Sequence, residues 1–362
     1  MDHRRPRSRS RTRRVSASAG LLLASLGGMA DAQSEFILAR EFIYADAPFP
    51  SAHASTIVET SAGTLLAAWF GGTAEGHDDV EIWLSREAVD GSWSAPKAVT
   101  RTPGMPVWSP VLFHDRDTTW LFFKVGPSPR EWVGGVRRSA DGGETWGPVT
   151  YLPAGLIGPV RTKPLALDDG TWLAGTSVEA GYDGDTRADA PYRGWAVWVE
   201  RSADRGRTWS RHGPITVPGE PYGVIQPTLW QTDGGEVRML MRSTERIGRI
   251  VQSSSADGGR TWTAGRPTEL PNPNAGIDVV RLRDGRLVLI YNHTTRGRNA
   301  IHLAVSRDDG ETWTPPSVLE EGPGEYSYPA VIQSVDGTVH VTYTWRRTHI
   351  RHLVIDPVEL PG

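Results

Sequence analysis

The segment from His53 to Asp79 contains several side chains that can move protons. It holds His53 itself and, within the glycine-rich run from Gly71 to Gly76, the acid Glu75. A carboxylic acid can protonate a leaving oxygen, and a histidine can accept or deliver a proton during bond cleavage. We therefore predict that His53, Glu75 and Asp79 are catalytic and that the run around Glu75 is a loop.

A second set of side chains suits an anion. Arg161 and Lys163 stand two residues apart in "GPVRTKPLAL", and residues two apart on a strand share one face. Arg242 follows the apolar run "VRMLM", and Arg298 precedes the run "AIHLAVS". A guanidinium binds a carboxylate with two parallel hydrogen bonds. The sequence therefore predicts a site for a carboxylate-bearing substrate.

Further polar and aromatic side chains could bind the hydroxyls and rings of a sugar. Amide and carboxylate oxygens accept hydrogen bonds from hydroxyls, and an aromatic face covers the apolar side of a ring. Asn and Asp also make ordinary turns, so this set is less specific than the cations. The candidate substrate-binding residues of this kind are Trp108, Gln226, Asn274, Asp278, Tyr328 and Arg346. Tyr326 is a further candidate catalytic residue, and Glu179 and Glu200 are reserve bases.

An internal repeat indicates how these side chains are positioned. "SADGGETW" begins at Ser139, and close copies begin at Ser202, Ser255 and Ser306, with a worn copy at Ser85. The aspartate accepts backbone hydrogen bonds in a tight turn, the glycine supplies a positive φ, and the tryptophan fills the gap to the next sheet. We expect the repeat to build hairpins and to have no catalytic role.

The repeat period predicts the fold. Copies about fifty to sixty residues apart are typical of a propeller, and the alternating runs "RLVLIYNH" and "TVHVTYTW" read as strands. Residues 33–362 would hold about six such units, so we predict an all-β, six-bladed β-propeller with Asp-box hairpins. Because the loops of all blades meet at one mouth of a propeller, the scattered candidates are expected to converge there.

Residues 1–32 are predicted to be a signal peptide, and residues 33–362 the propeller domain. Seven arginines precede the apolar run "ASAGLLLASLGGMA", and Ala30-Asp31-Ala32 resembles a cleavage site. The pair Arg13-Arg14 is compatible with twin-arginine export. We therefore expect a periplasmic or secreted protein without a membrane anchor.

The composition excludes some partners and cofactors. Without residues 1–32 the formal charge falls from −3 to near −8, which argues against nucleic acid as a partner. The chain has no cysteine, so its stability must come from its core. His77, Asp78 and Asp79 lack the spacing of a known metal site, so no metal or cofactor is predicted. We expect a monomer.

The four repeats resemble the Asp-box, or BNR repeat, of the sialidase superfamily. The resemblance covers essentially all of residues 33–362 and implies a six-bladed propeller. Sialidases use three arginines to bind a sugar carboxylate, a tyrosine nucleophile paired with a glutamate, and an aspartate as acid and base. By this resemblance Tyr326 matches the nucleophile, Arg242 the second arginine and Arg298 the third.

The chain departs from the sialidase pattern at several positions. Gln226 stands where the family has its glutamate, and an amide cannot take a proton. His53-Ala54-Ser55 stands where the family has its first arginine. The family's acid aspartate maps only loosely onto the loop from Glu75 to Asp79. The sequence thus describes a divergent member, without the first arginine and without the glutamate partner of the tyrosine.

Three functions remain open from the sequence. The first is an exo-acting glycoside hydrolase for a uronic or ulosonic acid, which the resemblance favours. The second is a polysaccharide lyase acting next to a uronate with His53 and Tyr326 as base and acid, which the departures favour. The third is a glycan-binding propeller without catalysis, since Asp-boxes also occur in proteins that are not enzymes.

Overall fold

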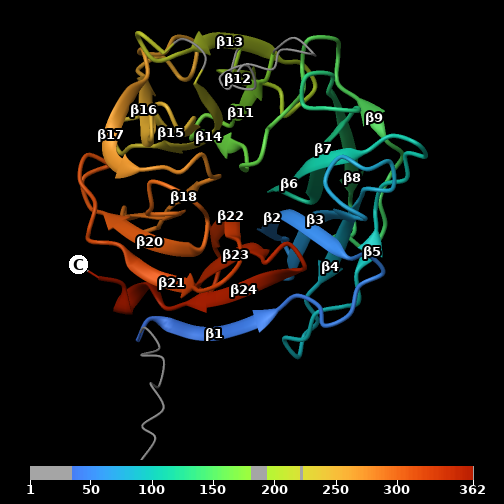
Figure 1. Cartoon of the computed structure of the whole chain (residues 1–362). Helices are drawn as coiled ribbons and strands as arrows, with labels where there is room; N and C mark the ends of the chain where they lie inside the picture. The colour runs from blue at the N-terminus through green and yellow to red at the C-terminus, as the bar shows by residue number, and fades with distance from the viewer. Residues whose placement is uncertain (1–34, 181–193, 221–222, 362) are drawn as a thin grey trace, which may run out of the picture. The chain divides into compact units, whose positions relative to one another are not determined.

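The computed structural model describes residues 35–180, 194–220 and 223–361. In these residues the strands form six antiparallel sheets of four strands, set around a central axis (Figure 1). The predicted all-β, six-bladed propeller is confirmed. The predicted signal peptide lies outside the described residues. No helix in the described part of the chain has the length and apolar character needed to cross a membrane.

The strands of each blade are named here from the innermost to the outermost. Blade 1 has β2 (Ser51–Glu59), β3 (Leu65–Gly72), β4 (Glu81–Arg86) and β5 (Lys97–Ala98). Blade 2 has β6 (Val107–Asp115), β7 (Thr118–Val125), β8 (Val133–Ser139) and β9 (Thr150–Tyr151). Blade 3 has β10 (Leu165–Ala166), β11 (Trp172–Val178), β12 (Ala196–Ser202) and β13 (Ser210–Ile215).

The remaining blades follow the same order. Blade 4 has β14 (Val224–Gln231), β15 (Val237–Ser243), β16 (Arg249–Ser255) and β17 (Arg266–Pro271). Blade 5 has β18 (Asp278–Arg281), β19 (Leu287–Tyr291), β20 (Ala300–Ser306) and β21 (Ser317–Glu321). Blade 6 has β22 (Tyr326–Gln333), β23 (Val339–Trp345), β24 (His349–Ile355) and β1 (Ile37–Phe42). A short 3₁₀ helix, η2 (Pro357–Glu359), follows β24.

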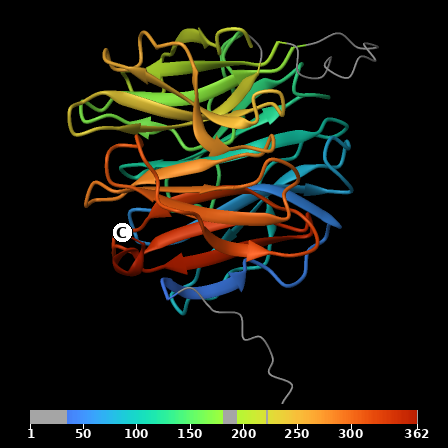
Figure 2. The same cartoon turned by 60° about the vertical axis from the view of Figure 1, so that its left-hand side comes forward.

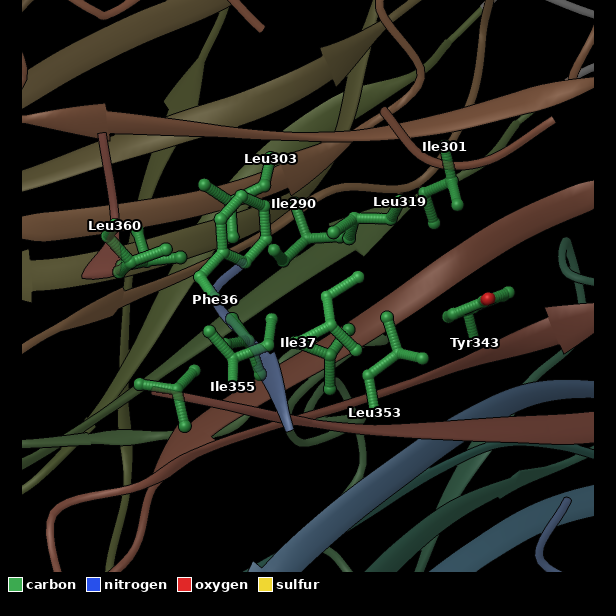
Figure 3. Packing of buried hydrophobic residues seen from close by; sticks show 14 of the residues in the cluster. Phe36, Ile37, Ile290, Ile301, Leu303, Leu319, Tyr343, Leu353, Ile355 and Leu360 are labelled. Atoms are coloured by element: carbon green, nitrogen blue, oxygen red, sulfur yellow. The ribbon is translucent and has the colours of Figure 1, made fainter. Parts of the chain in front are cut away.

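Strand β1 closes the ring by pairing with β24, so blade 6 combines segments from the two ends of the propeller (Figure 2). Phe36 and Ile37 bury their side chains between blades 5 and 6, next to Ile290 and Ile355 (Figure 3). Burial of such side chains contributes roughly 1.5–3 kcal/mol each. The outermost strand of blade 6 is therefore held by apolar packing as well as by its backbone hydrogen bonds.

The four complete Asp-boxes form the turns between the third and fourth strands of blades 2 to 5. At Asp257, Oδ1 accepts hydrogen bonds from Ser255 Oγ (2.8 Å) and from the Thr261 amide (2.9 Å), and Oδ2 accepts one from Thr261 Oγ1 (2.6 Å). Gly259 has a φ of +85°, and a Cβ there would lie 2.9 Å from Leu173 of the preceding blade. The repeat therefore closes a turn and packs it against the neighbouring blade.

The inner strands carry a feature that the sequence did not reveal. In four of them the pairing register shifts at a bulge, after His53, Trp108, Ile225 and Ser327. A bulge breaks the alternation of side chains and redirects one of them, often beside an active site. One residue per blade at this level has a left-handed backbone, with φ between +44° and +81°: Ala54, Ser109, Arg161, Gln226, Asn274 and Tyr328.

Candidate active site

The functional side chains gather at the mouth opposite the Asp-boxes. Asp-boxes follow the third strands, whereas the connections between second and third strands lie at the other end of each antiparallel blade. Arg242 ends β15, Arg298 precedes β20, and Arg347 lies between β23 and β24. The loop that contains Glu75 joins β3 to β4. The topology thus brings candidates from blades 1, 4, 5 and 6 to one end of the channel, as predicted for a propeller.

Tyr328 and Arg242 form the centre of the site. The phenol oxygen of Tyr328 accepts a hydrogen bond from Nη1 of Arg242 at 2.7 Å. The same Nη1 donates to Oε1 of Gln226 (3.0 Å), and Nε donates to Oδ1 of Asn274 (2.9 Å). Three of these four residues are the left-handed positions of blades 4, 5 and 6. Two bulges and the left-handed backbone of Asn274 therefore place the acceptors around one buried guanidinium.

Three guanidinium groups surround the ring of Tyr328. The Cζ atoms of Arg161, Arg242 and Arg298 lie 5.5, 5.6 and 5.3 Å from its centroid. Cations at such distances are attracted by the face of an aromatic ring. The imidazole of His53 packs beside the same ring, with centroids 4.1 Å apart. Positive charge is therefore concentrated around one phenol.

Glu325 and Arg347 extend the site as a chain of ion pairs. Glu325 Oε1 accepts from Nη1 of Arg298 (3.0 Å), and Oε2 accepts from Nε of Arg347 (2.9 Å). Arg347 also donates from Nη1 to Glu75 at 2.7 Å. Burial raises the pKa of Glu325, but hydrogen bonds from Ser327 and Arg347 outweigh it and lower that pKa. Glu325 is thus a carboxylate that already occupies two arginines.

His53 is buried and neutral. Its Nε2 lies 3.3 Å from Nη2 of Arg347, and because an arginine can only donate, this nitrogen is the acceptor and Nδ1 carries the proton. Burial, helped by Arg347, Arg298, Arg161 and Arg242, holds the pKa of His53 well below its usual range. The side chain is 0% exposed, so it supports Tyr328 from within the protein.

Glu179 is an acid at the same mouth, just after β11. Burial raises its pKa; Arg242 lowers it, while Glu75 raises it further. No side chain in the described part of the chain donates a hydrogen bond to its carboxylate. A half-buried carboxyl group with a raised pKa is suited to general acid catalysis. Of the two reserve bases, Glu179 is thus the one at the mouth.

Tyr326 lies apart from this cluster. It is 0% exposed and belongs to the apolar cluster between blades 5 and 6. Its hydroxyl contacts the carbonyl of Pro323 (3.3 Å) and Nε of Arg346 (3.2 Å). Arg346 is exposed and its guanidinium lies over Trp345. Tyr326 and Arg346 therefore form a pair of their own behind the mouth.

Lys163 and Asp278 form an ion pair that links blades 3 and 5. Lys163 Nζ donates to both oxygens of Asp278, at 3.0 and 2.9 Å. Asp278 also accepts from Thr228 Oγ1 (2.8 Å) and from the Val331 amide (2.9 Å). The carboxylate of Asp278, in blade 5, thereby binds residues of blades 3, 4 and 6. Residues 161–164 do not form a strand, so Arg161 and Lys163 do not share a strand face.

The remaining candidates line the rim or the interior of the blades. Asp79 accepts from the Thr73 amide (3.0 Å) and hydroxyl (2.8 Å), so it closes the loop that presents Glu75. The ring of Trp108 covers Gly76 in that loop, where a Cβ would lie 3.1 Å from it. Glu200 is 0% exposed and accepts two backbone hydrogen bonds, so it is buried between blades 2 and 3.

An open pocket adjoins the arginines. It has a volume of about 290 Å³ and is lined by Glu245, Pro273, Asn274, Gly297, Arg298 and Glu325. Three other cavities lie along blade 4, two of them bordered by the Asp-box of blade 5, and none is lined by a residue of the site. Among residues 35–180, 194–220 and 223–361, no three His, Asp or Glu side chains come together as metal ligands.

Sequence reasoning missed Glu325. The first residues of an inner strand lie at the mouth. An acid directly before the strand that begins "YSYP" could therefore have been recognised as a site residue. Tyr328 was predicted as a substrate-binding residue, and the site is centred on it. The proline after Ser109, Gln226 and Tyr328 could have marked the bulges.

The sequence and the fold have relatives among known proteins. Residues 63–341 match the family model of the BNR repeat-like domain, and the chain belongs to this family. A curated sialidase of Micromonospora viridifaciens is 26% identical over 82% of this chain and 50% of its own length. One from Bacteroides fragilis is 23% identical over 84% of this chain and 61% of its own. The chain therefore spans about half to three-fifths of these relatives.

Solved structures show the same fold at lower identity. The NanB sialidase of Streptococcus pneumoniae superposes with a TM-score of 0.71 at 13% identity, covering 89% of this chain and 71% of its own. A protein of unknown function from Dyadobacter fermentans superposes with a TM-score of 0.70 at 20% identity, covering 88% and 98%. The chain thus belongs to the BNR repeat-like family and has the fold of these structures.

Proposed function

We propose that the protein is an exo-acting glycoside hydrolase for a sugar that carries a carboxylate, with Tyr328 as its nucleophile. The observation that carries the proposal is the hydrogen bond from Arg242 to the Tyr328 phenol, inside a ring of three guanidinium groups. Cations placed where negative charge develops lower the barrier of a reaction. A phenol also approaches a carboxylate-bearing anomeric centre without the repulsion that a carboxylate would meet.

Arg242 and Arg298 would hold the substrate carboxylate. Both are near Tyr328, and Arg298 also borders the open pocket. Glu325 now occupies Arg298 and Arg347, so the substrate anion has to compete with it or share the arginines. Hydrogen bonds of Arg161, Lys163 and Asp278 link blades 1, 3, 5 and 6 across the channel, so we expect a glycan to reach Tyr328 with one end. This supports exo action.

Glu179 would act as the general acid. The phenol of Tyr328 gives its proton to water as its oxygen bonds to the anomeric carbon, and the glycosidic oxygen leaves with the proton of Glu179. A second water then attacks the same carbon and gives one proton to Glu179, while the tyrosine oxygen leaves and regains its proton from water. Burial, helped by Glu75, raises the pKa of Glu179, which favours the protonated form that the first step needs. We further propose that the protein is exported as a monomer to the periplasm or the medium.

Gln226 favours a second candidate, a polysaccharide lyase. It replaces the carboxylate that would draw the proton from the tyrosine of a sialidase, while Gln226, Asn274 and Arg242 form a neutralising set for a uronate carboxylate. Tyr328 would then remove the α-proton and return it to the leaving oxygen. His53 is a poorer base for this step because it is fully buried.

The test is incubation with glycans and glycosides containing uronic or ulosonic acids, followed by mass spectrometry and absorbance near 235 nm. A released monosaccharide with one added water and no absorbance supports the hydrolase. A rise in absorbance without added water shows elimination and replaces the proposal with the lyase. Binding of a glycan without any product from it would contradict both and leave a binding propeller.

A further inference from the structure

Arg161 connects three blades across the channel. It stands in blade 3 with a left-handed backbone, at a φ of +81°. Its Nη1 donates to the carbonyl of Ser55 in blade 1 at 2.8 Å, and its Nη2 donates to the carbonyl of Pro329 in blade 6. No other described arginine reaches the inner strands of two further blades in this way.

Both acceptors belong to bulges. Ser55 follows the left-handed residue Ala54, and Pro329 follows the left-handed residue Tyr328. The β-ladder skips these residues, since the register shifts between His53 and Thr56 and between Ser327 and Ala330. A buried carbonyl that the ladder leaves out needs another donor. Arg161 provides that donor to both bulges at once.

Arg161 is not available to a substrate. Only 2% of the residue is exposed, and both terminal nitrogens are engaged by the protein. Burial lowers its pKa to about 10, partly offset by Asp278, so it remains a cation at neutral pH. Its guanidinium carbon lies 5.5 Å from the Tyr328 ring, on the inner side of the site.

We propose that Arg161 is a positioning residue, which fixes the Tyr328 bulge and thereby directs the phenol at Arg242, rather than a ligand of the substrate carboxylate. The effect on turnover rests on the proposed function, whereas the effect on the position of Tyr328 does not. A left-handed backbone at a non-glycine residue persists only where its surroundings hold it. The guanidinium is the group that holds it here.

The experiment combines a probe of Tyr328 with kinetics. The full chain is made with 3-fluorotyrosine at position 328, and its fluorine NMR line is compared in the parent, Arg161→Lys and Arg161→Gln proteins. The matched control is Arg137→Lys, because Arg137 also bridges carbonyls of two blades, at Val99 and Trp146, but lies far from the mouth. Circular dichroism verifies folding.

We expect both Arg161 variants to move or split the fluorine line, and Arg137→Lys to leave it in place. With a substrate in hand, kcat should fall about 10- to 100-fold, as for a misplaced reacting group, and KM should stay within about twofold. An unmoved line in a folded Arg161 variant overturns the proposal, and so does a raised KM with unchanged kcat. If the parent proves inactive, only the proposed function fails, and the fluorine line still decides the role of Arg161.

Discussion

The phenol of Tyr328 and the guanidinium of Arg242 are joined by a 2.7 Å hydrogen bond at the mouth of the propeller. The two residues are 86 positions apart in the chain and come from blades 6 and 4. Tyr328 lies at a bulge of its inner strand, and Arg242 is the second-last residue of β15. The pair therefore reports directly on whether the site is assembled.

Replacing Arg242 should disable the site. Arg242→Ala removes the cation and leaves the buried oxygens of Gln226 and Asn274 without their donor, a loss that typically costs about 2–5 kcal/mol in binding or catalysis. We expect kcat/KM to fall at least about 30-fold. Arg238→Ala is the control, because Arg238 lies on the same strand and pairs with Glu236 and Glu311. Equal activity of the two variants would contradict the assignment of Arg242 to the active site.

The sequence favoured Tyr326 as the catalytic tyrosine and Tyr328 as a substrate-binding residue. On a regular strand, residues two apart point to the same side, so both tyrosines would face the channel. The bulge after Ser327 and the left-handed backbone of Tyr328 send one side chain to the mouth and the other into the core. The same loss of alternation separates Arg161 from Lys163. The proline after Tyr328 marks the bulge, but the direction of each side chain depends on contacts across the channel.

The role of Glu179 predicts a pH dependence. Burial raises the pKa of this carboxyl group, and it acts only while protonated, so kcat/KM should fall as pH rises through that pKa. Glu179→Gln should abolish this alkaline limb and cost about 10²–10⁴-fold on a natural glycan. Substrates with a nitrophenol leaving group, which needs no proton, should lose far less. Retention of the alkaline limb in Glu179→Gln would exclude the residue as the acid.

The Asp-boxes should affect stability and leave catalysis alone. Hydrogen bonds from Thr261 and Ser255 lower the pKa of Asp257, so its contribution is present above the ordinary pKa of aspartate and is lost as pH falls below it. Asp257→Ala should lower the melting temperature at pH 7 while kcat of the folded enzyme stays within about twofold. The difference from wild type should shrink in strong acid. A large drop in kcat at full folding would contradict this role.

Because Lys124 is buried, we expect the free energy of unfolding to rise with pH above neutrality. Burial lowers the pKa of Lys124 to about 7, so the folded protein releases this proton more readily than the unfolded chain. Between pH 7 and 9 the free energy of unfolding should therefore increase, by at most about 1.4 kcal/mol per pH unit. Urea denaturation of wild type and Lys124→Met measures this. A slope that persists in the variant would assign it to another group.

The fold was more predictable than the site for a physical reason. The Asp-box encodes its turn within eight residues, through Asp257 and Gly259 in blade 4 for example, and it occurs four times. The chain length then set the number of blades. The site is built from one or two residues per blade. Glu325 belongs to it through ion pairs with Arg298 and Arg347, which lie in other loops and are distant in sequence.

The central claim is that the reactive tyrosine is Tyr328, and the most direct measurement compares kcat of Tyr328→Phe and Tyr326→Phe on the same substrate. Loss of a nucleophile should lower kcat by roughly three orders of magnitude or more in Tyr328→Phe. Tyr326→Phe, which loses only its contacts with Pro323 and Arg346, should stay within about threefold of wild type. An active Tyr328→Phe beside an inactive, folded Tyr326→Phe would contradict the account.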